Sequence, residues 1–375
     1  MHPNCLRTTA TPHVFRRHPR VARRLVAVAG ALALLLAAPT AASAGAAVDV
    51  RTTGAAGDDG AALGPADTDP VLNPTTARLA GADRYETAVA ISRAGHPEGS
   101  PVVYVASGVG FADALSAGPA AAHAGGPLLL TPSSALPSVI RSEIERLAPE
   151  QIVVVGGEGA VSADVYAKLA ALAPDIRRDS GPDRYATSRV VNERAFGGDG
   201  PFTVSLVATG RDYPDALSAG ATAGAWGVPV ILVDGLASRA DAETKALLQR
   251  LGIRGVHIVG GTGAVTAGVE KDLGTVLVDG VARQAGRDRY ETSVRVNAAV
   301  FGSADEALLA TGGDFADALA GAALAGSVPM PLWVVPKTCV PKLTLGEGRY
   351  LGVTRYTLLG GRGALDDRVA SLDQC

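Results

Sequence analysis

Aromatic residues are scarce in this chain. Phe, Trp and Tyr together make up 4% of its 375 residues, whereas apolar residues of all kinds make up 47%. The apolar share is ample for buried cores, which must therefore be built mainly from Ala, Val and Leu. Side chains of that size suit close packing of helices against a sheet.

Long apolar runs are also few. Residues 25–38 form the one extended apolar run, and it is shorter than the about 20 residues that a membrane-spanning helix needs. Arginines precede the run and an A-x-A site follows it at residues 42–44. Together these features predict a cleaved signal peptide over residues 1–44 and a secreted chain with no membrane partner; an uncleaved anchor is the alternative. Residues 45–77, rich in Gly, Ala, Asp, Thr and Pro, are interpreted as a flexible linker.

Positive charge is in short supply once the signal peptide is removed. The whole chain has 34 Lys and Arg against 37 Asp and Glu, and six of the arginines lie in residues 1–44. The mature chain therefore keeps 28 basic residues and has a net charge of −9. An acidic chain is a poor general binder of nucleic acid, so no nucleic-acid partner is expected. An anionic ligand would need a local cluster of arginines.

Cysteine is rare as well, and only Cys339 and Cys375 follow the signal peptide. In an oxidising compartment we expect them to form a disulfide that ties the C-terminal residue to its domain; a pair of free thiols is the alternative. No cluster of His or Cys lies near them, and no E/D-x-D cluster is repeated. The sequence therefore predicts neither a metal site nor divalent-metal catalysis.

What the chain does have is one sequence pattern that occurs three times. The pattern R-x-x-G-x-D-R-Y-x-T begins at Arg78, Arg178 and Arg283, with spacings of 100 and 105 residues. Asp-Ala-Leu and Gly-Gly-x-Gly-Ala motifs follow each copy and begin at Asp113, Asp215 and Asp317, and at Gly156, Gly260 and Gly360. This period is too long for a solenoid unit and indicates three copies of one small domain. The copies are assigned to residues 78–175, 176–279 and 280–375.

Each copy alternates short apolar segments with helical patterns. In the first copy, strands are expected at 102–106, 128–130 and 152–155, and helices at 111–124, 136–147 and 161–172. Equivalent strands are expected at 204–208, 230–233, 257–259, 307–310, 332–335 and 356–359. Apolar strands separated by helices predict an α/β fold, a small parallel sheet covered by helices. Between Pro336 and Tyr350 the third copy departs from this plan, and a Gly-rich irregular stretch is expected to replace the helix.

Two motifs resemble known cofactor-binding or catalytic motifs. The Gly-Gly-x-Gly turn at Gly156 follows a strand as a dinucleotide-binding loop does, but it lacks the third glycine of G-x-G-x-x-G, so a tight structural turn is favoured. The residues around Ser116 and Ser218 resemble a nucleophile elbow, yet Ala320 takes that place in the third copy. The mature chain has three histidines at non-equivalent positions, which cannot supply a repeated Ser-His pair. No cofactor and no catalytic residue are predicted.

Repeated charged residues are the remaining candidates for a binding site. They are Arg78, Arg84, Arg178, Arg184, Arg283, Arg289, Asp113, Asp215 and Asp317. Each aspartate opens a predicted helix, where the helix dipole stabilises it by about 0.3–1 kcal/mol; alternatively, it pairs with the D-R-Y arginine and orients it. For each arginine, bracing of strand ends is the structural alternative to ligand contact. Three sets of guanidinium groups on an acidic chain favour a polymer with repeated carboxylates or phosphates.

Taken together, these motifs and a P-x-L-L strand resemble the cell wall-binding repeat 2 family over nearly all of residues 78–375. The resemblance implies three Rossmann-like modules in a pseudo-threefold arrangement. It also implies a secreted bacterial protein held non-covalently at the cell surface by an anionic secondary cell-wall polymer. The family links the P-x-L-L segment to polymer attachment. The matching residues are Pro127, Leu129, Leu130, Pro229, Ile231, Leu232 and Pro331, and Trp333 departs from the pattern.

The sequence therefore predicts a non-catalytic protein of the cell wall. Its expected partner is an anionic secondary cell-wall polymer or a peptidoglycan-linked glycan, with a secreted wall enzyme as a further possible partner. The alternative is a wall-modifying hydrolase, or an accessory protein of a peptidoglycan amidase. A hydrolase requires an acid–base pair in a cleft, and the sequence offers no convincing pair.

Overall fold

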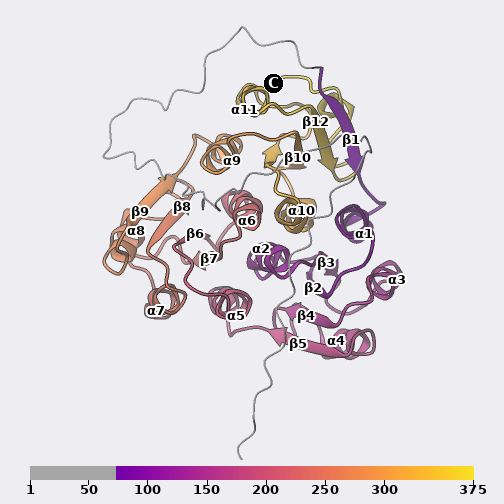
Figure 1. Ribbon diagram of the computed structural model, residues 1–375, viewed down its shortest axis with the longest axis horizontal. Helices are drawn as coiled ribbons and strands as arrows, with labels where there is room; N and C mark the ends of the chain where they lie inside the picture. The colour runs from indigo at the N-terminus through magenta and orange to yellow at the C-terminus, as the bar shows by residue number, and fades with distance from the viewer. Residues whose placement is uncertain (1–72) are drawn as a thin grey trace, which may run out of the picture. The chain divides into compact units, whose positions relative to one another are not determined.

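The computed structural model describes residues 73–375. The expected signal peptide and residues 45–72 of the expected linker lie outside this range. Within it, twelve strands alternate with twelve helices, and the strands pair in parallel to form three four-stranded sheets (Figure 1). The predicted α/β fold of three repeated modules is confirmed.

The first module contains a sheet with the strand order β3-β2-β4-β5. Its strands are β2 (Val102–Ser107), β3 (Leu128–Thr131), β4 (Gln151–Val155) and β5 (Asp175–Asp179). The helices α1 (Arg84–Gly95), α2 (Ala114–Ala124), α3 (Ser138–Leu147) and α4 (Ala163–Ala170) alternate with them along the chain. β2 is buried along its whole length, as expected for an inner parallel strand with helices on both faces.

The second and third modules repeat this arrangement. The second sheet, in the order β7-β6-β8-β9, consists of β6 (Val204–Thr209), β7 (Val230–Val233), β8 (Gly255–Val259) and β9 (Gly280–Gln284). The third, in the order β11-β10-β12-β1, consists of β10 (Glu306–Thr311), β11 (Leu332–Val335), β12 (Arg355–Leu359) and β1 (Thr75–Leu79). Their helices are α5 (Arg184–Phe196), α6 (Pro214–Trp226), α7 (Ala242–Arg250), α8 (Ala267–Gly274), α9 (Arg289–Ala298), α10 (Ala316–Ser327), α11 (Lys342–Leu351) and α12 (Asp367–Ala370).

Each sheet gains a fourth strand that the sequence did not predict. This strand opens a sequence repeat, but it pairs with the last strand of the preceding repeat: β5 pairs with β4, β9 with β8, and β1 with β12. β1 begins at Thr75, so residues 75–77 belong to a strand rather than to the expected linker. These edge strands contain few buried apolar residues, which is why an apolar pattern did not reveal them.

The helix after each such strand crosses to the next sheet and covers its free edge. In α5, the Asn192 side-chain amide donates to the Val230 carbonyl at 2.6 Å, and the Ser188 hydroxyl accepts from the Leu232 amide at 3.0 Å. The equivalent serine and asparagine of α9 make the same contacts with β11. These bonds satisfy backbone groups that an edge strand would otherwise leave unpaired.

Helices α2, α6 and α10 pack against one another where the three modules meet (Figure 1). Their contact surfaces are made of Ala and Gly. A Cβ on Gly326 would overlap Ala122 and the backbone of Gly224, so the three helices approach as closely as their backbones permit. The prediction that small residues build the packed interior is confirmed at this contact. None of the helices in residues 73–375 combines the length and apolarity that crossing a membrane requires.

The Gly-rich stretch of the third module corrects a prediction. Residues 342–351 form helix α11 and not an irregular segment. Gly348 lies in this helix because the ring of Tyr356 lies against it, and a Cβ there would overlap the Tyr356 hydroxyl. Glycine weakens a helix by roughly 0.5–1 kcal/mol relative to Ala, but here it provides the space for a large aromatic side chain.

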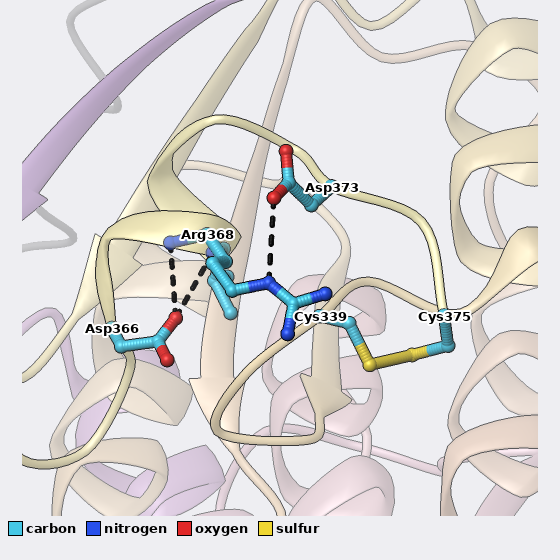
Figure 2. The surroundings of a disulfide bond; sticks show 6 residues. Cys339, Asp366, Arg368, Asp373 and Cys375 are labelled. Atoms are coloured by element: carbon cyan, nitrogen blue, oxygen red, sulfur yellow. Dashed lines mark hydrogen bonds and ion pairs between the residues drawn. A yellow bond between two sulfur atoms is a disulfide. The ribbon is translucent and has the colours of Figure 1, made fainter.

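The predicted disulfide between Cys339 and Cys375 is present (Figure 2). It lies beside two backbone bonds, from the Val340 amide to the Asp373 carbonyl at 2.8 Å and from the Cys375 amide to the Val340 carbonyl at 3.1 Å. Arg368 contacts Asp373 at 3.4 Å in the same turn. The C-terminal residues are therefore tied to the segment between β11 and α11, as the sequence indicated.

Candidate functional site

The aspartate of each Asp-Ala-Leu motif faces the D-R-Y arginine of the next repeat. At the junction of the first and second modules, Asp113 and Arg184 line a cleft of about 520 Å³. Loops after β2, β3, β4 and β5 form its walls. The cleft therefore lies at the carboxyl ends of parallel strands, where open α/β sheets bind their ligands. We call the three equivalent places the first, second and third junctions, built around Asp113 and Arg184, Asp215 and Arg289, and Asp317 and Arg84.

Local backbone geometry directs Asp113 into the first junction. It immediately precedes α2 but makes no capping hydrogen bond with its side chain, so the carboxylate is free to extend toward the Gly-Gly turn. A Cβ on Gly156 would lie 2.6 Å from Asp113 Oδ2, and Gly156 has a φ of +103°. Both the conformation and the close approach require glycine at the first position of this turn. Asp215 and Asp317 lie in the same way against Gly260 and Gly360.

The junction aspartates are partly removed from water. Burial raises the pKa of Asp113, and the Thr187 hydroxyl and the Arg184 guanidinium partly oppose the rise. Burial likewise raises the pKa of Asp317 to about 6, and the neighbouring Asp314 adds to the rise, while Arg84 opposes it. Asp113 and Asp317 are thus each influenced by the charge of an arginine from a different repeat. This electrostatic interaction connects neighbouring modules and does not act within one repeat.

Each D-R-Y arginine donates through Nη1 to a glycine carbonyl of its own repeat. Arg184 Nη1 donates to the Gly210 carbonyl at 2.7 Å, and its guanidinium carbon lies 5.6 Å from the centre of the Phe111 ring. The preceding Asp183 caps α5 by accepting from the Ala186 amide at 2.8 Å. Arg84 and Arg289 make the equivalent bonds to glycine carbonyls at 2.6 and 2.7 Å. Arg184 is thus held between a carbonyl of its own repeat and an aromatic ring of the preceding module.

The first arginine of each repeat has a different environment. Nη1 of Arg78, Arg178 and Arg283 donates to the carbonyl of the first glycine of a Gly-Gly turn, at 2.7 Å in each case. Arg178 also stacks on Tyr166 of α4 at 4.8 Å, and Arg283 pairs with Glu270 of α8 at 2.6 Å. Arg178 is not among the residues that line the cleft. These contacts fit the bracing role that the sequence left open for them.

The P-x-L-L residues lie in the core. Leu129, Leu130, Ile231 and Leu232 are 0% exposed, and Pro127, Pro229 and Pro331 are buried as well. Their strands β3, β7 and β11 form one edge of each sheet and are covered by helices. A polymer at the surface cannot touch these side chains. Any effect of the P-x-L-L residues on polymer attachment must therefore come from their contribution to the folded structure.

The serines that resembled a nucleophile elbow are buried in helix contacts. The Ser116 hydroxyl bonds that of Ser188 at 2.7 Å, and both Ser116 and Ser218 are 0% exposed. The nearest candidate base on α2, His123, contacts Asp199 at 2.8 Å and stacks on Phe196 at the far end of that helix. Within residues 73–375, no group of three or more His, Cys, Asp or Glu side chains is arranged to hold a metal ion.

Sequence reasoning missed an aromatic cluster at the centre of the three junctions. Phe111, Tyr213 and Phe315 each precede a central helix, and their ring centres lie 5.5–5.8 Å apart in edge-on contacts. The guanidinium carbon of Arg84 lies 5.4 Å from the centre of the Phe315 ring, and that of Arg184 lies 5.6 Å from the centre of the Phe111 ring. An aromatic residue two positions before each Asp-Ala-Leu was a repeated signal that could have identified this cluster.

Comparison with known proteins agrees with this arrangement. The family model described as cell wall binding domain 2 matches residues 78–166, 178–270 and 283–370. The N-acetylmuramoyl-L-alanine amidase LytC of Bacillus subtilis is 27% identical over 297 residues, which is 78% of this chain and 57% of the relative. The amidase enhancer of the same organism is 28% identical over 295 residues, 78% of this chain and 39% of the relative. The chain thus spans about half the length of these relatives or less.

Two solved structures share the fold. Cwp6 from Clostridium difficile superposes with a TM-score of 0.72 at 24% identity, covering 80% of this chain and 48% of that one. Cwp8 from the same organism gives a TM-score of 0.71 at 27% identity, covering 80% and 51%. The three family matches together take in well over half of the sequence. The chain belongs to the cell wall binding domain 2 family.

Proposed function

We propose that this protein attaches non-covalently to an anionic secondary polymer of the bacterial cell wall, without catalysing a reaction on it. The observation that carries the proposal is the first-junction cleft, in which the partly exposed Arg184 lies between the Gly210 carbonyl of its own repeat and the Phe111 ring of the first module. Membership of a wall-binding family supplies the setting. Export through the expected signal peptide and residence at the cell surface are parts of the same proposal.

The contacts divide the predicted residues into two groups. The D-R-Y arginines Arg84, Arg184 and Arg289 would contact acidic groups of the polymer, because a guanidinium fork suits phosphate and carboxylate. Arg78, Arg178 and Arg283 would hold the Gly-Gly turns that shape the junctions. The aspartates would orient the junction, and the P-x-L-L strands would support it from the core.

Retention on isolated cell walls of the producing bacterium tests this function. The purified chain should sediment with intact walls and remain in solution with walls extracted in cold hydrofluoric acid, which cleaves phosphodiester-linked polymers. Walls treated with a carbodiimide and a neutral amine, which blocks carboxylates, provide the parallel test for a carboxylate polymer. Equal retention on intact and on both kinds of treated wall would refute an anionic ligand.

A second candidate function is support of a wall amidase, because the chain is similar to an amidase and to an amidase enhancer. Release of dye from labelled peptidoglycan separates the two possibilities. The chain alone should release none. An increase in dye release when the chain is added to a purified amidase would favour the accessory role. Unchanged dye release would leave wall attachment as the one remaining function of the two.

A further inference from the structure

The three junctions are built from equivalent parts, but one position opposite the arginine differs. It is the residue immediately before each aromatic ring of the central cluster, and it is occupied by Gly110, Asp212 and Asp314. Gly110 lines the same cleft as Arg184, and Asp314 forms an ion pair with Arg84. Asp212 and Arg289 both lie close enough to Asp215 to affect its pKa, but among the contacts of residues 73–375 they form no ion pair with each other. The first junction therefore lacks a carboxylate that the other two have.

In the third junction, this carboxylate occupies the arginine. Arg84 Nη1 donates to the Gly108 carbonyl at 2.6 Å, and Nη2 donates to Asp314 Oδ2 at 3.1 Å. Both terminal nitrogens of Arg84 are therefore already bonded. An acidic group arriving from solvent would have to displace Asp314 before it could form a forked contact with this guanidinium.

In the second junction, Asp212 accepts a backbone hydrogen bond as Asp314 does but is not paired with the arginine, because Arg289 is bonded only to the Gly312 carbonyl among the contacts of residues 73–375. Asp212 Oδ1 accepts from the Tyr213 amide at 2.8 Å, as Asp314 Oδ1 accepts from the Phe315 amide at 2.6 Å. Asp212 raises the pKa of the neighbouring Asp215, whose rise is due mainly to burial. Asp212 lies three residues before Asp215, so it adds a negative charge that the first junction lacks at this position, and this charge would oppose an incoming anion.

In the first junction, Gly110 leaves Arg184 without such a neighbour. Nη1 bonds the Gly210 carbonyl, and within residues 73–375 no carboxylate lies within ion-pair distance of this guanidinium. Gly110 and Arg184 both line the cleft. A Cβ on Gly110 would meet no atom within 4 Å, and its φ does not require glycine, so packing does not explain the absence of a side chain.

Other acidic residues do not remove this difference. Asp183 caps α5, and Asp83 and Asp288 cap the equivalent helices, so this charge is common to all three junctions. Glu158, in the Gly-Gly turn of the first module, is exposed and does not line the cleft. Arg362, at that position in the third module, is paired with Asp367 at 2.8 Å. The contrast between Gly110 and the two aspartates remains.

We propose that the first junction is the principal site for an acidic group of the wall polymer, a phosphate or a carboxylate bound by the free Nη2 and Nε of Arg184, and that Gly110 makes it accessible. The proposal rests on the proposed function and adds which of the three junctions binds. Acidic groups would then bind more weakly at the second and third junctions, where Asp212 and Asp314 add negative charge.

Reciprocal substitutions test the assignment in the full chain. Gly110→Asp should bring a carboxylate to Arg184 and weaken retention on isolated walls about tenfold or more, as loss of hydrogen bonds to a charged group does. Gly110→Asn, of the same size without the charge, should retain nearly wild-type affinity. Asp314→Gly added to Gly110→Asp should restore part of the retention by freeing Arg84.

The outcomes separate this inference from the proposed function. If the wild type is retained and Gly110→Asp is retained equally well, the assignment to the first junction is wrong while wall attachment stands. Equal losses in Gly110→Asp and Gly110→Asn would also overturn it, because charge would then not be the cause. If the wild type itself is not retained, the proposed function fails. Equal melting temperatures of the variants establish that a loss concerns binding, and the two treated walls distinguish phosphate from carboxylate.

Discussion

The first and third modules have the same fold but stabilise it differently. Helices α3 and α11 are both ten residues long and both follow a proline, so their positions correspond one to one. In the first module, Leu129, Ile144 and Ile152 fill the space between helix and sheet. In the third module, the same places are taken by Trp333, Gly348 and Tyr356. Larger side chains on the strands are thus compensated by a glycine on the helix.

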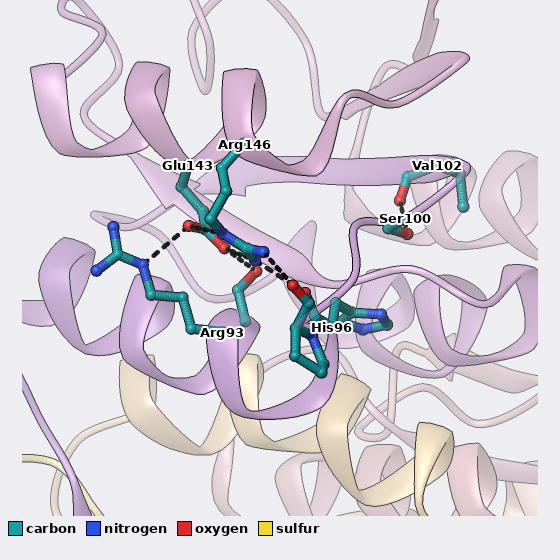
Figure 3. A network of polar contacts seen from close by, with 8 residues as sticks. Arg93, His96, Ser100, Val102, Glu143 and Arg146 are labelled. Carbon is teal, nitrogen blue, oxygen red and sulfur yellow. Dashed lines mark hydrogen bonds and ion pairs between the residues drawn. The ribbon is translucent and has the colours of Figure 1, made fainter. Parts of the chain in front are cut away.

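The first and third modules also differ in how they accommodate a buried glutamate. Glu143 of α3 is fully buried and is bonded by Ser92, Arg93 and Arg146 at 2.7–3.1 Å (Figure 3). Glu347, at the corresponding position of α11, is buried at 5% exposure and has no hydrogen-bond or ion-pair partner among the contacts of residues 73–375. The two modules therefore show that the core can be rebuilt, whereas the glycine, aspartate and arginine of each junction are repeated residue for residue.

Breaking the charge network of the first module should have the largest effect. Glu143→Gln removes the carboxylate that bonds two arginines and should cost about 3 kcal/mol of unfolding free energy. Burial alone would raise the pKa of Glu143, but the bonds from Arg146, Ser92 and Arg93 outweigh it and lower the pKa. This stabilisation is present above pH 4.5 and is lost as the pH falls through the lowered pKa. Denaturant unfolding at pH 7 measures it, with the exposed Glu145→Gln as control; equal effects of the two would contradict the network's role.

Removing the disulfide should weaken the third module next. Cys339→Ser opens a loop of 36 residues and should cost about 2–4 kcal/mol. The first module has no equivalent cross-link. Wild-type protein treated with a reductant should lose the same stability, and the double serine variant should match the single one. A change of less than about 0.5 kcal/mol would mean that the backbone bonds at Val340 suffice.

The size compensation in the third module can be tested at two glycines of one helix. Gly348→Ala places a methyl group against the Tyr356 hydroxyl and should destabilise by about 1–3 kcal/mol. Gly346→Ala, where a Cβ meets nothing within 4 Å, should instead stabilise by up to about 1 kcal/mol through helix propensity. Thermal unfolding of the two variants gives the sign of each effect. The same sign at both positions would show that packing against Tyr356 does not determine Gly348.

The smallest effect is expected at Glu347. Burial raises its pKa, so its stabilising contribution is present below pH 4.5 and is lost as the pH rises through the raised value. Glu347→Gln should therefore stabilise by about 1 kcal/mol at pH 7 and change little near pH 4. Unfolding free energies at both pH values test this. Destabilisation at pH 7 would indicate that the carboxylate has a partner.

Much of the organisation followed from local patterns in the sequence. The repeat, the alternation of apolar strands and helices, and the low aromatic content predicted three α/β modules with small-residue packing. The Gly-rich stretch before Tyr350 gave a wrong prediction, because residues 342–351 form a helix although glycine weakens one. Gly348 of α11 provides space for the side chain of Tyr356 in β12. No local sequence pattern reveals such a contact.

The sequence by itself determined the number of modules, their order, their fold class and the pairing of the last two cysteines, because period, apolar content and cysteine count are properties of the chain alone. Only the tertiary structure decided that the first strand of each repeat joins the sheet before it, so that Asp113 meets Arg184 of the next repeat and β1 completes the third sheet. The physical reason is that strand pairing and helix crossover act over about a hundred residues, where neighbours in space are no longer neighbours in sequence.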